Sequence, residues 1–196
     1  MFKVELCDIE NCMHPVFFQA TRCFHHLENR EEWLADLVKY LQQESHITGL
    51  DLSDISLENL DLSGKVFTTC NIARARFTNV NFQNAKMHIV FFDFASFENC
   101  NFQGTFIINS VFAGSTVNQC DFRGSDLARN NFVGILARDT KFNNSDLYAS
   151  RFTNSTLENV EFIDCNIKRV NFKHTAITNV NFRYSNSEEA FFEGEV

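Results

Sequence analysis

The sequence contains a single proline and has no apolar run long enough to cross a membrane. Proline interrupts backbone hydrogen-bond ladders, so its scarcity favours a long and regular β architecture. The first residues do not combine a basic segment with an apolar stretch, so no signal peptide is expected. A glycine-rich phosphate loop, a G-x-S-x-G motif and an H-E-x-x-H motif are also missing. These absences predict a protein that is not an enzyme, uses no cofactor and does not enter a membrane.

Positive charge is also scarce, because 17 Lys and Arg stand against 25 Asp and Glu, for a formal charge of −8. The acidic excess lies in residues 1–45 and 186–196, whereas the stretch between them is balanced. A nucleic-acid binder is expected to carry a basic surplus, so nucleic acid is not an expected partner. Seven cysteines without an export signal predict free thiols in a reducing cytoplasm.

Phenylalanine is abundant, with 23 residues, and much of it recurs with a period of five. Stepping by five from Leu52 to Phe182 gives 27 positions, which are all apolar and include 14 Phe. Small residues dominate two places before each of these positions, and Gly, Asn or Asp dominate two places after. Residues two apart in an extended segment point to the same side, while Gly, Asn and Asp tolerate left-handed backbone at a bend. The pattern therefore predicts a solenoid of short straight segments joined by turns.

Units such as 75–79 (ARFTN), 80–84 (VNFQN) and 120–124 (CDFRG) resemble the repeats of pentapeptide-repeat proteins. The resemblance covers residues 50–184 and implies an all-β solenoid, a right-handed quadrilateral β-helix with 20 residues per coil and almost seven coils. Residues 20 apart then stack, which predicts two Phe ladders that face each other across the core. One ladder comprises Phe82, Phe102, Phe122, Phe142, Phe162 and Phe182, and the other comprises Phe92, Phe112, Phe132, Phe152 and Phe172.

Three regions are predicted: an N-terminal extension over residues 1–48, the β-helix over residues 49–185 and an acidic tail over residues 186–196. Leu34, Leu37, Val38 and Leu41 follow helical spacing and predict an amphipathic α-helix over about residues 29–44. Asn29, followed by Glu32, predicts a capping box. The helix is expected to close the N-terminal end of the core, with a regulatory or partner-binding helix as the alternative. The tail is expected to close the other end or to form a dimer contact.

Cysteine and histidine cluster in the extension, as Cys7, Cys12, His14, Cys23, His25 and His26. Thiolate and imidazole are the ligands that zinc prefers, but the spacings lack the C-x2-C pair typical of a zinc motif. The sequence therefore predicts scattered structural residues and no metal. In the repeats, Cys70, Cys100, Cys120 and Cys165 fall in the inward column of small residues, where cysteine packs as a small hydrophobe.

Nine apolar residues break the polar pattern of the outward positions on two adjoining faces of the middle coils. They are Val66, Ile89, Phe106, Ile108 and Tyr148 on one face and Phe91, Phe94, Val111 and Val133 on the next. An exposed apolar patch normally marks an interface. Three occupants are open: the chain's own N-terminal segment, which carries Phe17, Phe18 and Phe24, a second copy in a homodimer, or a different protein.

Basic residues follow this patch toward the C-terminus on the same two faces. They are Arg129, Arg151, Lys168, Arg169, Lys173 and His174, and they predict a basic end that could bind an anion.

The favoured function is a non-enzymatic, rigid scaffold for protein interactions. The resemblance supplies an alternative, because some pentapeptide-repeat proteins, the Qnr-type quinolone-resistance proteins, mimic DNA and protect bacterial gyrase. Mimicry needs a strongly negative face, whereas this repeat region is neutral, and its unbroken register leaves no room for projecting loops. Gyrase binding is therefore disfavoured. A bacterial effector module is a further alternative that no feature of the sequence tests.

Overall fold

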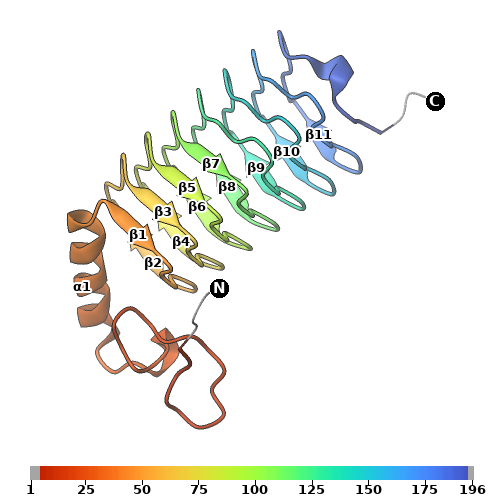
Figure 1. The fold of residues 1–196 in the computed structure, drawn as a ribbon. Helices are drawn as coiled ribbons and strands as arrows, with labels where there is room; N and C mark the ends of the chain where they lie inside the picture. The colour runs from red at the N-terminus through yellow and green to blue at the C-terminus, as the bar shows by residue number, and fades with distance from the viewer. Residues whose placement is uncertain (1–4, 194–196) are drawn as a thin grey trace.

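The computed structural model describes residues 5–193 and forms a stack of coils with a helix at its N-terminal end (Figure 1). Within this part of the chain, none of the helices has the length and apolar character needed to span a bilayer. The helical elements are η1 (Phe24–His26), α1 (Arg30–Gln43) and η2 (Ser187–Glu189), of which η1 and η2 are 3-10 turns. The strands are β1 (His46–Thr48), β2 (Ser56–Glu58), β3 (Val66–Thr68), β4 (Arg76–Thr78), β5 (Lys86–His88), β6 (Ser96–Glu98), β7 (Phe106–Ile108), β8 (Thr116–Asn118), β9 (Leu136–Arg138), β10 (Thr156–Glu158) and β11 (Ala176–Thr178).

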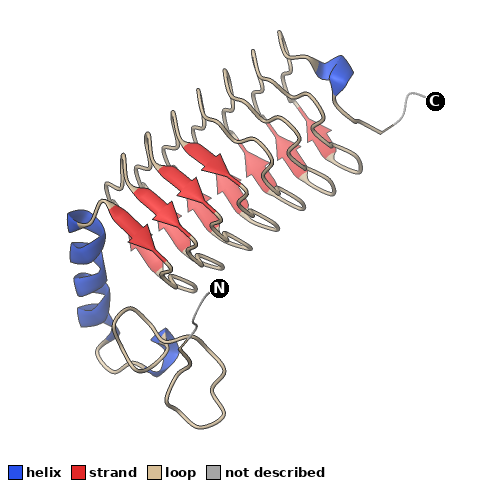
Figure 2. Cartoon of the chain, in the orientation of Figure 1, coloured by secondary structure: helices blue, strands red, loops and turns tan. Residues whose placement is uncertain are grey.

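The strands run parallel and pair with partners 20 residues away, so one coil contains 20 residues, as predicted. Face 1 is the sheet β1-β3-β5-β7, and face 3 is the seven-stranded sheet from β2 to β11 (Figure 2). Single parallel bridges form the two faces between them: face 2 runs from Asp51 to Phe191, and face 4 runs from Asp61 to Asn181. The fold is the expected quadrilateral β-helix, with about seven coils.

A left-handed residue marks every corner of the coils. Each position two residues after a large inward residue, from Asp54 to Tyr184, has a positive φ. Asn, Asp and Gly occupy most of these corners because they reach this conformation at little cost. The column of bend residues that the sequence predicted is therefore confirmed.

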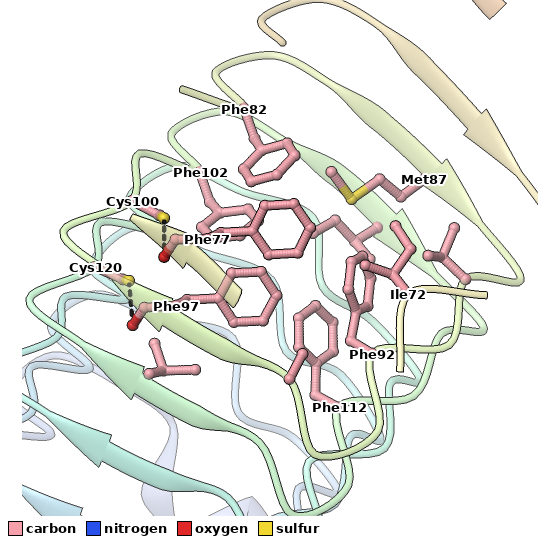
Figure 3. Close-up of a cluster of buried hydrophobic side chains, with 14 of the residues drawn as sticks. Ile72, Phe77, Phe82, Met87, Phe92, Phe97, Cys100, Phe102, Phe112 and Cys120 are labelled. Carbon is pink, nitrogen blue, oxygen red and sulfur yellow. Dashed lines mark hydrogen bonds between the residues drawn. The ribbon is translucent and has the colours of Figure 1, made fainter. Parts of the chain in front are cut away.

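The two predicted Phe ladders occupy faces 4 and 2 and fill the core. Phe102 and Phe122 stack with their ring centroids 4.4 Å apart, and Phe112 and Phe132 stack at 5.0 Å on the opposite face. Figure 3 shows part of this core, in which the thiol of Cys100 donates a hydrogen bond of 3.5 Å to the carbonyl of Phe77. Each fully buried Phe contributes about 1.5–3 kcal/mol through removal of its apolar surface from water.

The inward column of small residues also carries hydrogen bonds. The hydroxyl of Ser125 accepts a bond from the backbone N–H of Thr105 and donates to the carbonyl of Phe102. Asn130, which is the largest of the buried polar residues in this column, is bonded at both ends of its amide. Small inward side chains therefore link consecutive coils as well as leaving space for the Phe rings.

Helix α1 closes the N-terminal end of the core, as predicted. Leu37 and Leu41 are fully buried, and Leu34 and Val38 pack against the same core. Lys65 reaches the helix from the coil below and donates to the carbonyl of Glu44 near the end of α1. The regular coil begins one unit before Leu52, because Ile47 of β1 is buried in the same register.

The predicted capping box is wrong in its chemistry. Asn29 has a φ of 57° and its side chain makes no capping hydrogen bond. In this left-handed conformation its carbonyl accepts the bonds instead, from the N–H groups of Glu32 and Trp33.

The acidic tail extends the core beyond the predicted boundary at residue 185. Phe191 continues face 2 by bridging Asn171, and Phe192 stacks on Phe172 with ring centroids 5.0 Å apart. The ring of Phe192 also meets Phe182 edge to face at 5.5 Å. These contacts cover the C-terminal end of the Phe ladders, which is the first of the two roles expected for the tail.

Candidate protein interface

Six of the nine predicted patch residues lie side by side on two consecutive coils, and we call them the apolar patch. They are Ile89, Phe91, Phe94, Phe106, Ile108 and Val111. Phe91 bridges Val111 across face 2, and the N–H of Ile89 donates to the carbonyl of Ile108 across the corner between faces 1 and 2. Phe94 is 68% exposed and Phe106 is 42% exposed. Two aromatic rings therefore reach solvent from a rigid framework.

Two patch residues occupy backbone positions that suit other residue types. Ile89 and Phe94 stand at corners with φ values of 55° and 56°, a conformation that Asn, Asp or Gly adopts at most corners of the solenoid, although Thr69, Arg129, Ala149 and Arg169 also adopt it in the column of Ile89. A left-handed conformation costs an L-residue about 1–2 kcal/mol, and a β-branched residue such as Ile89 is a marked exception there. Local stability therefore does not account for these apolar side chains.

The ring of Phe94 lies over the next coil. A Cβ atom built on Gly114 would be only 2.6 Å from the ring carbons of Phe94, so the ring uses the space that the missing side chain leaves. Gly114 itself has a φ of 65°, which glycine adopts without strain. This contact fixes one face of the ring and leaves the other face open to solvent.

One carboxylate lies within the apolar patch. Burial raises the pKa of the Asp93 carboxyl above its ordinary value of 3.8. No ion pair with Asp93 is formed among residues 5–193, in contrast to Asp54, which binds Arg74 through two hydrogen bonds of 2.7 Å. The apolar patch therefore contains a carboxylate that lacks a charged partner.

The remaining predicted members do not adjoin these six. Val66 is separated from Phe106 by Lys86 in the strand register, so a charged residue interrupts the apolar surface. Val133 is half-buried two coils beyond Asp93. Tyr148 accepts a hydrogen bond of 3.1 Å from Arg169, whose guanidinium also lies 5.9 Å from its ring, so it belongs with the basic end.

The N-terminal segment does not cover the apolar patch in the described residues, so the first of the three expected occupants is corrected. Phe17 and Phe18 are buried in the main core and Phe24 packs against it. The segment that carries them lies beside α1 at the N-terminal end of the stack (Figure 1). These rings pack on the core at the end of the solenoid and leave Phe94 and Phe106 exposed in the middle coils. Residues 1–4 lie outside the described range.

The predicted basic residues are all exposed, but acids of the tail neutralise part of their charge. They comprise Arg129, Arg151, Lys168, Arg169, Lys173 and His174. Lys168 forms an ion pair with Glu189, and His174 Nδ1 lies 2.5 Å from a carboxylate oxygen of Glu193. The tail thus turns the C-terminal end into a mixed surface, which weakens the case for an anion site.

The cysteines of the repeats face the core, as predicted. Cys70, Cys100, Cys120 and Cys165 are all buried, and burial raises the pKa of the Cys165 thiol to about 11. A nucleophilic cysteine needs an accessible thiolate, so these residues serve packing.

Four cysteine and histidine residues of the extension converge instead of lying scattered. Ligand atoms of Cys7, Cys12, Cys23 and His26 all lie within 4.8 Å of one another. His14 and His25 stand beside this group, where His25 lies 3.8 Å from the carboxylate of Asp54.

Several exposed apolar residues were not predicted from the sequence. Leu136 on face 3 is 48% exposed, and Tyr184 and Met13 are more exposed still. These three lie on separate parts of the molecule and form no patch with one another, so a single outward apolar residue is a weak signal.

Comparisons with known proteins agree with this geometry. A model described as "Pentapeptide repeats (8 copies)" matches residues 51–88 and 92–129, and one described as "Pentapeptide repeat region" matches residues 115–192. The chain belongs to the pentapeptide-repeat family. No curated protein sequence matches the chain at a significant level.

Comparison with solved structures finds proteins of low sequence identity, of which the first supports a shared fold. A trypsin-treated variant of QnrB1, a plasmid-mediated fluoroquinolone resistance protein, is 15% identical, with a TM-score of 0.50 over 76% of this chain and 84% of that one. A pentapeptide-repeat protein from the thylakoid lumen of Arabidopsis thaliana is 17% identical, with a TM-score of 0.32 over 69% and 71% of the two chains. HetL from the cyanobacterium Nostoc, involved in heterocyst differentiation regulation, is 11% identical, with a TM-score of 0.27 over 82% and 97%.

Proposed function

We propose that this protein is a non-enzymatic scaffold that binds another protein through the apolar patch. The observation that carries this proposal is the use of Ile89 and Phe94 at left-handed corners, where both cost backbone energy and Phe94 exposes most of its side chain to solvent. A feature that lowers stability and solubility together is typical of a binding site.

The chemistry of the apolar patch suits a protein partner. Interface cores are enriched in aromatic residues, and a few of them contribute most of the binding energy. Phe94 and Phe106 are the candidates for this role, because their rings are exposed on a framework that loses little entropy on binding.

Asp93 favours a different protein over a second copy of this chain. In a twofold homodimer centred on the apolar patch, two Asp93 carboxylates would approach each other and repel. A partner that places a cation or a hydrogen-bond donor beside Asp93 would relieve this cost. We infer that the partner combines an apolar anchor with a basic or amide group.

DNA mimicry remains disfavoured. The acids of faces 3 and 4 are partly neutralised by their neighbours, as in the pairs Arg123–Asp121 and Arg138–Glu158. A phosphate mimic needs an uninterrupted run of negative charge, which these pairs break. The likeness to QnrB1 concerns the fold alone.

An enzymatic role gains no support either. A groove of about 350 Å³ between faces 3 and 4 is lined by Asp139, Lys141, Glu161 and several asparagines. It offers no cysteine, serine or histidine nucleophile with an adjacent base among its described lining residues.

A pull-down from the native host, with Phe94→Asp and Phe106→Asp beside the wild type, tests the proposal. We expect both variants to remain folded and to lose the same partner. Leu136→Asp is the matched control, because it places the same charge on face 3 at an apolar residue whose exposure, 48%, lies between those of Phe106 and Phe94. Light scattering of the purified wild type measures its oligomeric state. A homodimer would contradict the inference that the partner is a different protein.

A further inference from the structure

The converging residues of the extension come from two short pieces of backbone. Cys7 and Cys12 flank a tight turn that is closed by the hydrogen bond from the N–H of Cys12 to the carbonyl of Ile9. Cys23 directly precedes η1 and His26 is its last residue, and the N–H of His26 donates to the carbonyl of Cys23. Each pair therefore projects two ligand atoms from one turn.

Backbone hydrogen bonds hold the two pieces together. The N–H of Cys7 donates to the carbonyl of His14, and the N–H of Asp8 donates to the carbonyl of Thr21. The second bond places the Cys7–Cys12 turn against the segment that leads into Cys23. The two turns consequently face each other with their side chains inward.

Three of the six distances between the ligand atoms match those of a tetrahedral zinc site, and all six are within 4.8 Å. With Zn–S bonds of about 2.3 Å and a Zn–N bond of about 2.0 Å, tetrahedral geometry separates two sulfurs by about 3.8 Å and a sulfur from the nitrogen by about 3.5 Å. The Sγ atoms of Cys12 and Cys23 are 3.8 Å apart. The Nδ1 atom of His26 lies 3.4 Å from Sγ of Cys7 and 3.5 Å from Sγ of Cys23.

Packing alone accounts poorly for this arrangement. Within residues 5–28, regular structure is limited to the bridge between Leu6 and Pro15 and the three residues of η1. A segment of this size cannot bury enough apolar surface to fix its own backbone, and small units of this kind usually depend on a metal or disulfides. Cys7 and Cys23 are buried while His26 reaches solvent, which is suited to a site that closes on an ion from one side.

We propose that Cys7, Cys12, Cys23 and His26 bind one Zn²⁺ ion in a structural Cys3His site. Four protein ligands fill the tetrahedral shell, so no position is open for substrate and the ion serves structure. The site would hold residues 5–28 in the shape that presses Phe17 and Phe18 onto the first coil. Zinc would thereby stabilise the packing of residues 5–28 against the N-terminal end of the solenoid.

Metal analysis of the full-length protein tests this assignment. The protein is purified under reducing conditions without chelators, and its zinc content is measured by inductively coupled plasma mass spectrometry. We expect about one Zn²⁺ per chain, as a four-ligand site requires. After zinc removal, added Co²⁺ should give the intense visible spectrum of tetrahedral thiolate coordination. A wild type that holds no zinc and gives no such spectrum overturns the proposal.

Matched histidine variants separate coordination from general packing. His26→Ala should lose zinc or bind it far more weakly, whereas His14→Ala, which removes a histidine 3.5 Å from Sγ of Cys12, should retain it. Cys23→Ser should lose the thiolate spectrum. Circular dichroism checks that the β-helix persists in each variant, so that metal loss is not a consequence of global unfolding.

Two further outcomes would contradict the proposal. If His14→Ala and His26→Ala lost zinc equally, the assigned ligand set would be wrong. Under the same reducing conditions, mass spectrometry that detects a Cys12–Cys23 disulfide in the native protein would show that oxidation, and not zinc, joins the two turns.

Limited proteolysis provides the positive readout: a chelator should expose residues 5–28 to cleavage and leave the coils resistant.

Discussion

Replacement of Asn130 by alanine tests whether the inward small residues link the coils by hydrogen bonds. The side-chain Nδ2 of Asn130 donates to the carbonyls of Ile107 at 2.6 Å and Leu127 at 2.9 Å, and its Oδ1 accepts from the N–H of Ser110 at 2.8 Å. All of these groups are buried, so water cannot replace the lost partners. Three bonds, each with a net value of about 0.5–1.5 kcal/mol, give an expected destabilisation of about 2–4 kcal/mol for Asn130→Ala.

Asn130→Ser is the control for this prediction. Ser150 occupies the next position of the same column, where its hydroxyl accepts from the N–H of Asn130 and donates to the carbonyl of Leu127. A serine at position 130 can make equivalent bonds, and we expect it to cost only about 1 kcal/mol for the single bond lost.

Urea unfolding followed by circular dichroism measures both variants, with the slope of the transition compared with that of the wild type. An unchanged slope indicates that the free energies refer to the same transition. If Asn130→Ala cost less than about 1 kcal/mol, or if Asn130→Ser cost as much as alanine, the hydrogen-bond argument would be refuted.

Three predictions concern the apolar patch. Ile89→Asn should raise the free energy of unfolding by about 1 kcal/mol, because Asn tolerates the left-handed corner, and it should weaken partner binding; a loss of stability would contradict the strain argument. Gly114→Ala should lower the free energy of unfolding more than Gly124→Ala does, because a Cβ at Gly124 meets nothing within 4 Å. A double-mutant cycle should show that this difference vanishes when Phe94 is also replaced by Ala. Asp93→Asn should raise the free energy of unfolding at pH 7, and this gain should shrink as the pH falls toward 4. The reason is that the pKa of Asp93 is raised in the folded state, so that the folded state binds more protons than the unfolded state between pH 3.8 and the pKa of the folded state. Urea unfolding across this pH range checks the last prediction, and a gain that stays constant with pH would rule out titration of Asp93 as its source.

The sequence was sufficient to predict the coils because each of them repeats the same physical requirement. A large residue such as Phe122 fills the core, a small residue such as Cys120 leaves room for it, and Gly124 makes the bend. The period predicted the inward column and its buried cysteines, and together with the 20-residue coil that the family resemblance implies it predicted the register and the Phe ladders residue by residue. It did not predict Ile47 and Phe192 as members of the stack, because the neighbouring units depart from the pattern there.

The extension was harder to predict because its structure depends on contacts between distant segments. The hydrogen bond from the N–H of Asp8 to the carbonyl of Thr21 brings Cys7 and Cys23 together, and the spacing of residues in the sequence does not predict this bond. The position of Phe17 and Phe18 was equally open, since apolar rings suit both the end of the core and the middle coils. Asn29 shows the same limitation at one residue: the cap motif was present, but the local backbone took a left-handed conformation.

The apolar patch was predicted in position but not in extent. Outward apolar residues were correctly placed on faces 1 and 2, yet Val66 and Tyr148 were assigned to the patch without regard to what lies between. In the structure, Lys86 separates Val66 from the apolar patch, and Arg169 donates a hydrogen bond to the hydroxyl of Tyr148. Side-chain partners of this kind do not follow from the repeat.

The most direct test of the proposed function is the affinity of the partner, once captured by the wild type, for Phe94→Asp and for Leu136→Asp. Both variants introduce one carboxylate at an exposed apolar residue, and only Phe94 belongs to the apolar patch. Calorimetric titration should show binding to Phe94→Asp weakened at least about 30-fold, as expected for loss of an anchor residue worth about 2 kcal/mol, with Leu136→Asp close to the wild type. Equal affinity for the wild type and Phe94→Asp would contradict the claim that this protein acts through its apolar patch.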